Sequence, residues 1–172
     1  RWGVNYIYGS GAVLPGLAAV GEDMTQPYIR RCVKWLTDRQ NDDGGWGESC
    51  GSYVDKTMHG VGPSTASQTA WALLALISSG DHECEAVQRG LYYLAGTQQK
   101  DGTWDEPYFT GTGFPGYGVG ERPTTQPKYG EPKYQGLDMP AGFMINYHLY
   151  RNYWPLLALG RYSRLRSDHK FH

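Results

Sequence analysis

The chain has 172 residues, with 16 Lys and Arg against 17 Asp and Glu, and a formal charge of −1. This length can bury one sizeable core, and the near-neutral balance gives no reason to expect nucleic acid as a partner. No apolar run approaches the ~20 residues of a membrane-spanning helix. The three cysteines and five histidines lack the spacing of a zinc site, so we expect neither a metal nor a cofactor.

The first predicted element is an apolar helix around Leu14, in "GAVLPGLAAVG". An amphipathic helix follows, and Pro27 is placed where a first-turn proline is tolerated. Ile29, Val33 and Leu36 fall at i, i+4 and i+7, the spacing of one buried stripe. We therefore expect an inner helix that is buried on several sides, followed by an outer helix that is buried on one.

A glycine-rich turn, "RQNDDGGWGES" at 39–49, follows the outer helix and recurs as "TQQKDGTWDEP" at 97–107. The matching residues, each pair 58 residues apart, are Gln40 and Gln98, Gly44 and Gly102, Trp46 and Trp104, and Glu48 and Glu106. A catalytic centre is seldom duplicated within a chain, whereas a structural unit often is. We predict that Gln ends the outer helix, Gly permits the turn, and Trp packs over the Gln and the next helix. Asp43 and Asp101 are expected to cap a following helix.

Between the two turns lies "STASQTAWALLALISSG" at 64–80, a helix that is apolar over most of its surface. Ser64 or Thr65 can cap its start, and Gly80 can end it. The second outer helix repeats the amphipathic stripe 58 residues later, at Val87, Leu91 and Leu94.

A third inner helix is predicted around Trp154, in "NYWPLLALGRY". Trp154 lies 83 residues after Trp71, which is 25 more than the repeat. The 25 residues of 117–141 are rich in Pro, Gly and charge, so we interpret them as a loop inserted into the repeat. Pro15 and Pro155 should kink or interrupt their helices.

The fold predicted from these elements is all-α, a partial α/α barrel (toroid) of stacked helical hairpins. About two and a half hairpins cannot close such a ring, and the chain starts at Arg1 without Met. We therefore expect residues 1–172 to be the C-terminal part of an α/α-barrel domain whose N-terminal part is absent.

The duplicated turns are those of the QW motif, and the chain resembles squalene–hopene cyclases of the triterpene cyclase family. The resemblance covers essentially the whole chain and is carried by "RWGVNYIYG", "PSTASQTAWALLAL" and "DEPYFTGTGFPG". It implies a two-domain, all-α enzyme that protonates squalene and guides a carbocation to hopene or hopanol. It also implies a peripheral, monotopic protein on the cytoplasmic side of the membrane, contacting lipid through the full-length protein, and is compatible with a homodimer.

In this family the proton donor is an aspartate of an Asp-x-Asp-Asp motif, which this sequence lacks. The resemblance therefore implies that the acid lies upstream, that no catalytic residue lies here, and that this part alone is inactive. It assigns a substrate-binding and cation-stabilising role to Trp2, Tyr8, Gly113, Phe114, Phe143, Tyr147 and Tyr150. Tyr147 and Tyr150 are expected to share one face of the final helix.

Two other readings stay open. An α/α-barrel glycosidase would use paired carboxylates, for which the candidates are Asp42, Asp43, Glu48, Asp105 and Glu106; their place in duplicated turns argues against it. A helical-repeat interaction module from a truncated gene would expose a large apolar face.

Overall fold

The computed structural model describes residues 3–53, 55–113 and 143–168. Within these residues the chain forms five α-helices, so the predicted all-α class is confirmed. They are α1 (Asn5–Ala19), α2 (Pro27–Asp38), α3 (Ala66–Ser78), α4 (Glu85–Thr97) and α5 (Tyr150–Asp168). Two short 3-10 helices, Cys50–Tyr53 and Lys56–Met58, lie between α2 and α3. Two three-residue strands, β1 (Gly111–Gly113) and β2 (Phe143–Ile145), precede α5.

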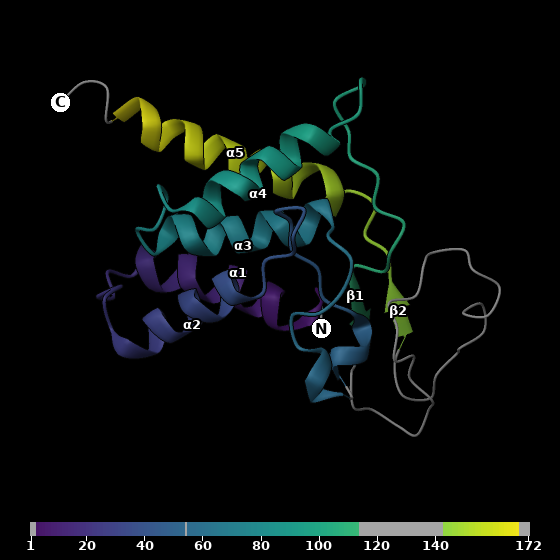
Figure 1. Cartoon of the computed structure of the whole chain (residues 1–172), viewed down its shortest axis with the longest axis horizontal. Helices are drawn as coiled ribbons and strands as arrows, with labels where there is room; N and C mark the ends of the chain where they lie inside the picture. Colours follow the sequence, from purple (N-terminus) through teal and green to yellow (C-terminus); the bar gives the residue numbers. More distant parts are fainter. Residues whose placement is uncertain (1–2, 54, 114–142, 169–172) are drawn as a thin grey trace.

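Helix α3 is the centre of the molecule. In Figure 1 it runs between α1 and α2 on one side and α4 and α5 on the other, and both α1 and α5 pack against it. Every residue of α3 from Ala66 to Ile77 is buried. Burying each large apolar side chain in such a helix stabilises the fold by about 1.5–3 kcal/mol. The three predicted inner helices therefore lie side by side, with the outer helices α2 and α4 beside them.

The ends of α3 follow the predicted signals. Thr65 is the N-cap residue, and its hydroxyl accepts a hydrogen bond from the Gln68 amide at 3.3 Å. After the helix, Gly80 adopts a φ of +85°, the left-handed conformation that glycine tolerates best.

The outer helices bury one stripe each. Ile29, Val33 and Leu36 are the buried residues of α2, as predicted. In α4 the buried residues are Val87, Gly90 and Leu94, while Leu91 is only partly buried. Gly90 belongs to the stripe because the missing side chain admits a neighbouring ring: a Cβ there would lie 2.8 Å from Cζ3 of Trp46.

Neither proline ends its helix. Pro15 lies inside α1 and Pro155 inside α5, and both helices continue beyond them. The interruption expected from the sequence does not occur. A proline removes one backbone hydrogen bond, and nearby contacts hold the helices in place: Leu14 and Ala158 are buried in the core cluster.

The short ribbon was not expected from the sequence. Strands β1 and β2 pair antiparallel, with Gly111 opposite Ile145 and Gly113 opposite Phe143. Thr110 extends this junction, since its carbonyl accepts from the Val4 amide at 3.0 Å and its hydroxyl from the Tyr147 amide at 2.8 Å. The ribbon thus ties the start of α1 to the entrance of α5.

The predicted inserted loop at 117–141 lies outside the described residues. Among the helices that the structure describes, none combines the length and the apolar character needed to cross a membrane.

Candidate functional site

The two glycine-tryptophan turns have the same geometry. Trp46 and Trp104 are buried, and each indole Nε1–H donates to a carbonyl in the last turns of the preceding outer helix, that of Leu36 or Leu94, at 2.8 Å. Gly44 and Gly102 have φ values of +88° and +86°. Each turn therefore closes back on its own outer helix, in agreement with a structural repeat.

The glutamines hold these turns in place. Gln40 Nε2 donates to the Gly44 carbonyl and to the Ala86 carbonyl of α4, both at 2.8 Å. Gln98 Nε2 makes the matching bond to Gly102 at 2.9 Å. The first turn thus joins two outer helices, because Ala86 lies in the first turn of α4.

The predicted helix-capping role of Asp43 and Asp101 is wrong. Each carboxylate accepts from an amide two residues later in its own turn, that of Gly45 at 2.9 Å and that of Thr103 at 3.0 Å. Both acids precede a positive-φ glycine, and extended chain rather than a helix follows the turn. The bond stabilises the turn itself.

Helix capping falls instead to the two glutamates. Glu48 is buried, and its Oε2 accepts from the amides of Asn5, Tyr6 and Ile7 at 3.1, 2.8 and 2.9 Å. These amides open α1, where unpaired donors and the helix dipole favour a carboxylate. Glu106 does the same for α3, accepting from the Ser67 amide at 2.9 Å and the Ser67 hydroxyl at 2.7 Å. Each hairpin is therefore closed by a glutamate that returns to the start of its inner helix.

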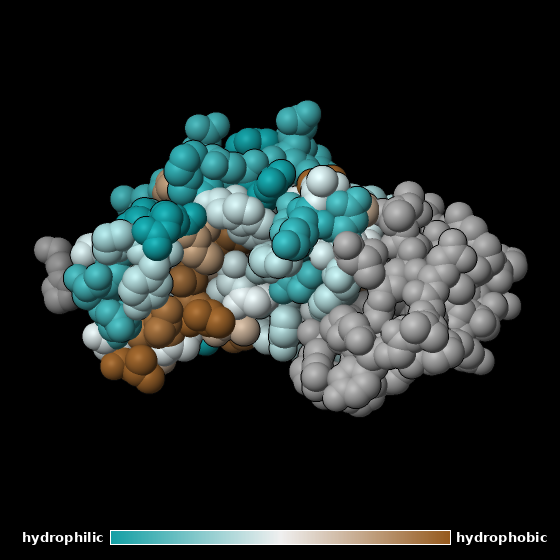
Figure 2. All heavy atoms as spheres, turned by 90° about the horizontal axis from the view of Figure 1, so that it is seen from below, coloured by the Kyte–Doolittle hydropathy of each residue, from teal (hydrophilic) through white to brown (hydrophobic). Residues whose placement is uncertain are grey.

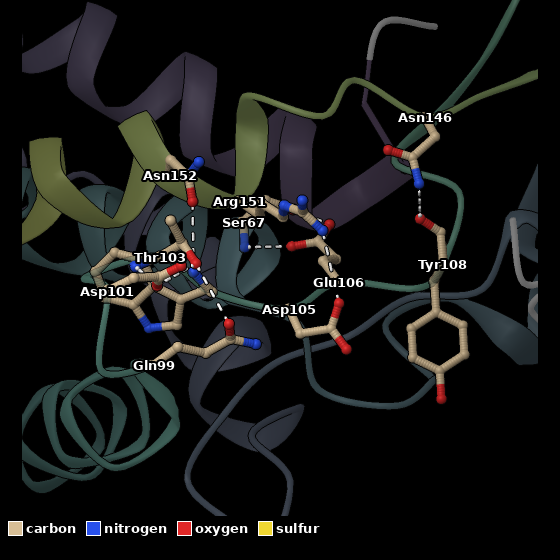
Figure 3. Close-up of polar contacts among 11 residues, drawn as sticks. Ser67, Gln99, Asp101, Thr103, Asp105, Glu106, Tyr108, Asn146, Arg151 and Asn152 are labelled. Carbon is tan, nitrogen blue, oxygen red and sulfur yellow. Dashed lines mark hydrogen bonds and ion pairs between the residues drawn. The ribbon is translucent and has the colours of Figure 1, made fainter.

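Glu106 has an unusual electrostatic environment. Burial raises its pKa from an ordinary 4.5 to about 7, and the Ser67 hydrogen bonds and the Arg151 charge only partly oppose that effect. Figure 3 shows Arg151 of α5 beside Glu106, with Asp105 on the same segment; Arg151 Nη1 lies 3.6 Å from Asp105 Oδ1. The second glycine-tryptophan turn therefore contacts the first helical turn of α5 through charged side chains.

This geometry does not favour the glycosidase reading. The two buried carboxylates, Glu48 and Glu106, bind the starts of two different helices. Asp42, Asp43 and Asp105 are exposed on the turns. A glycosidase needs two carboxyl groups facing one bond of a sugar, whereas Glu48 and Glu106 are engaged by separate helix starts.

The aromatic candidates gather at a different place, around Trp71 of α3. The Trp71 ring meets Tyr8 of α1 at 4.9 Å between centroids, and Tyr150 and Trp154 of α5 at 5.7 and 6.0 Å, all edge-on. Tyr147 stacks on Tyr150 at 4.6 Å. We call these five residues the aromatic cluster; it joins side chains from all three inner helices.

The predicted site residues are thus partly brought together. Tyr8, Tyr147 and Tyr150 belong to the aromatic cluster. The backbones of Gly113 and Phe143 are paired in the ribbon. Trp2 and Phe114 lie outside the described residues.

Tyr147 differs in detail from the prediction. It precedes α5, which begins at Tyr150, and its carbonyl accepts from the Tyr150 amide at 2.9 Å. The two tyrosines share a tight turn rather than a helix face, and their rings still stack. Trp71 and Trp154 are the cluster members that sequence reasoning treated only as helix markers. For Trp71 the reason is that a helix apolar over most of its surface gives no periodicity that singles out one side.

The cluster can stabilise positive charge. Aromatic faces attract cations by about 0.5–2 kcal/mol each when desolvated. Burial raises the pKa of Tyr150, so its hydroxyl stays protonated and neutral around physiological pH. Among the described residues, no group of three or more His, Cys, Asp and Glu side chains could hold a metal ion.

Comparison with known proteins identifies the family of the chain. The family model described as squalene–hopene cyclase C-terminal domain matches residues 1–120 and 119–164. The chain is 49% identical over 164 residues to the squalene–hopene cyclase of Alicyclobacillus acidocaldarius, covering 95% of this chain and 22% of that protein. It is 44% identical over 168 residues to a probable squalene–hopene cyclase of Sinorhizobium fredii, covering 97% and 22%.

A plant relative lies further away. Dammaradiene synthase of Dryopteris crassirhizoma is 39% identical over 183 residues, covering 98% of this chain and 23% of that protein. The chain thus spans about a fifth of the length of these relatives. With a family model that matches most of its length, the chain belongs to the squalene–hopene cyclase C-terminal domain family.

Proposed function

We propose that this chain forms the C-terminal wall of the cavity of an isomerase-type triterpene cyclase, which guides the carbocationic polycyclisation of squalene to hopene or hopanol. The observation that carries the proposal is the aromatic cluster, to which α1, α3 and α5 each contribute rings. Relatives that match nearly the whole chain are named squalene–hopene cyclases.

The chemistry of the reaction needs such a wall. A carbocation is captured by any good nucleophile, so its surroundings must lower its energy without offering one. Aromatic faces do so through their quadrupoles. A closely packed apolar wall also holds a flexible polyene in a reactive fold. Trp2, Tyr8, Gly113, Phe114, Phe143, Tyr147 and Tyr150 are the residues to which we assign this role.

The initiating proton has another source in this proposal. The sequence contains no Asp-x-Asp-Asp motif, and the buried carboxyl groups Glu48 and Glu106 are engaged by helix starts. We therefore propose that residues outside this chain supply the general acid, and that the chain alone does not turn squalene over.

We also propose peripheral attachment to the cytoplasmic side of the membrane. Figure 2 shows an apolar patch on the face that lies below α1 and α2 in Figure 1. Exposed apolar side chains support the proposal, among them Val13 of α1, Val20 just after α1, Leu149 just before α5 and Leu156 of α5. Flotation with phospholipid vesicles tests it: the full-length protein should float at high salt, and a protein that stays at the bottom of the gradient contradicts it.

The cyclase proposal is tested with the complete reading frame that encodes this chain. The purified protein is incubated with squalene, and the products are identified by gas chromatography and mass spectrometry. We expect a pentacyclic triterpene. Unchanged squalene from a protein with a cooperative melting transition would refute the proposal.

The cavity assignments need variants. Tyr8→Ala and Tyr150→Ala should release partly cyclised products, because a cation left without its aromatic face loses a proton early. Phe114→Ala should do the same. Tyr92→Ala is the control, since this tyrosine lies on the outer helix α4 and is 76% exposed. Product profiles that match the wild type in the first three variants would remove these residues from the cavity.

A further inference from the structure

Trp71 has no role so far beyond packing, yet its surroundings differ from those of the other buried tryptophans. It is 1% exposed and comes from the middle of α3. Its ring lies edge-on to Tyr8 at an interplanar angle of 70° and to Tyr150 at 83°. These two tyrosines come from different helices, α1 and α5, and both are candidates for lining the cavity. The Trp71 indole lies in contact with both.

The hydrogen bonding of Trp71 is also distinctive. Trp46 and Trp104 each donate Nε1–H to a helix carbonyl at 2.8 Å. Trp71 Nε1 is buried and has no hydrogen-bond partner among the described residues. A buried tryptophan usually finds such a partner, and leaving the donor unpaired costs stability. A hydrogen bond therefore does not explain why a tryptophan occupies position 71. The shape of the indole and its contacts with neighbouring rings do.

Two glycines permit the close packing around Trp71 and Tyr8. A Cβ on Gly11 of α1 would lie 2.7 Å from the Trp71 Cβ and 2.8 Å from its carbonyl oxygen, so α1 and α3 meet closely there. A Cβ on Gly3 would collide with the Tyr8 ring and lie 2.9 Å from Trp71 Cη2. The Gly3 carbonyl in turn accepts from the Tyr53 hydroxyl at 2.8 Å. The Tyr8 ring therefore packs closely against both the Gly3 backbone and the Trp71 indole.

The other side of the indole is fixed by α5. Trp154 lies edge-on to Trp71, and also to Tyr150 at 6.1 Å and 86°. Tyr150 thus contacts two perpendicular indoles and the stacked ring of Tyr147. A change in the volume of residue 71 alters the contacts of both tyrosines, because each ring packs directly against the Trp71 indole.

We propose that Trp71 is a positioning residue that sets the separation and tilt of Tyr8 and Tyr150, and through them the shape of the wall that meets the cyclising cation. The inference deepens the proposed function and rests on it. Trp71 acts through the two tyrosines and need not touch the substrate itself.

The test uses the full-length protein and the product distribution from squalene, measured at a temperature at which circular dichroism shows every variant folded. Trp71→Phe and Trp71→Leu shrink the spacer. We expect the ratio of partly cyclised to pentacyclic products to rise by about two- to ten-fold, the range for losing one edge-on ring contact. Gly3→Ala places a methyl group against the Tyr8 ring and the tip of the Trp71 indole and should raise the same ratio, which keeps the test available if the Trp71 variants do not fold.

Two controls separate positioning from stability. Trp46→Phe removes an indole that is equally buried and that donates a hydrogen bond to the Leu36 carbonyl. This variant should lower the melting temperature and leave the product ratio unchanged. Gly9→Ala adds a methyl group to α1 where no atom lies within 4 Å; it should raise the melting temperature slightly, because alanine favours the helix, and leave the product ratio unchanged.

The outcomes are distinguishable. A wild-type protein that forms no cyclic product refutes the proposed function and this inference together. An active wild type with an unchanged product ratio in the folded variants overturns only the role of Trp71. A ratio that rises as much in Trp46→Phe as in Trp71→Phe also overturns it, because the effect would then follow stability rather than ring position.

Discussion

Glu106 illustrates how much one side chain does in this molecule. Its carboxyl group is buried, caps α3 through Ser67, and lies beside Arg151 of the helix that carries Tyr150. Burial of a carboxyl group favours the protonated form, which explains a pKa of about 7. The same position in the preceding repeat, Glu48, receives three amide hydrogen bonds instead of one.

The raised pKa predicts a pH-dependent stability. Between pH 4.5 and about 7 the folded state keeps the Glu106 proton, whereas the unfolded state releases it. The folded state binds more protons in this window, so the free energy of unfolding should fall as pH rises, by up to about 3 kcal/mol, and level off above pH 7. Urea denaturation of the wild type and Glu106→Gln at several pH values checks this: the variant should lack that decline, and parallel curves would contradict the prediction.

At the scale of single helices, small residues decide how closely the elements approach. Gly90 of α4 leaves room for the Trp46 ring and for Leu73 of α3, whose Cδ2 would lie 2.9 Å from an added Cβ. Gly96, in the same helix, has no atom within 4 Å of that position. The two glycines have the same helix propensity and opposite surroundings.

Gly90→Ala should therefore destabilise the fold by about 1–3 kcal/mol, because an extra methyl group in a close-packed core forces its neighbours aside. Gly96→Ala should stabilise it by about 0.5 kcal/mol, since alanine favours the helix. Chemical denaturation measures both values. Equal effects of the two substitutions would mean that Trp46 does not pack against α4 as described.

The glutamate caps belong to the same scale. Glu48→Ala leaves the amides of Asn5, Tyr6 and Ile7 without their common acceptor, and should cost about 2–3 kcal/mol. Hydrogen exchange should accelerate first at these three amides and at the start of α1. Asp42→Ala, an exposed acid in the adjoining turn, is the control and should remain within about 0.5 kcal/mol of the wild type. Unchanged exchange in Glu48→Ala would argue that the cap contributes nothing.

At the scale of the whole molecule, two hairpins are joined at both ends of α2. Arg30 near its start binds Asp81 with two hydrogen bonds of 2.7 Å, and Gln40 beyond its end binds Ala86 of α4. Asp81 lies in the turn between α3 and α4. The α1–α2 hairpin is therefore fixed to the α3–α4 hairpin by polar contacts in addition to the shared core.

The duplicated glutamines offer a matched pair for measuring this joint. Gln40→Ala removes a bond within its turn and a bond to the neighbouring helix, whereas Gln98→Ala removes only the bond to Gly102. We expect a loss of about 1–2 kcal/mol for Gln40→Ala and less than about 0.5 kcal/mol for the exposed Gln98. Equilibrium unfolding of the two variants compares them; a larger loss at Gln98 would contradict the arrangement.

The regular parts of this fold were predictable from periodic residues. Ile29, Val33 and Leu36 mark the buried face of α2, and the 58-residue spacing of Trp46 and Trp104 identifies the repeat. Other features depend on contacts across the chain. The role of Glu48 requires the start of α1 to lie against a turn 41–43 residues later, which no local pattern encodes.

The candidate site shows the same division. Family resemblance pointed to Tyr8, Tyr147 and Tyr150, and the structure brings their rings into one cluster. Trp71 was not foreseen as its centre, because α3 is apolar over most of its surface and no single side stands out. The ribbon was missed because three residues are too few to show the alternation by which a strand is predicted.

The pairing of Gly113 with Phe143 has a consequence for how this family can vary and be engineered. The chain leaves β1 and returns in β2 at one paired junction. A segment of different length between the two strands can therefore leave the anchoring of α5 unchanged. Evolution, or exchange of this segment between homologues in the laboratory, can change the connection between β1 and β2 while the aromatic cluster keeps its position.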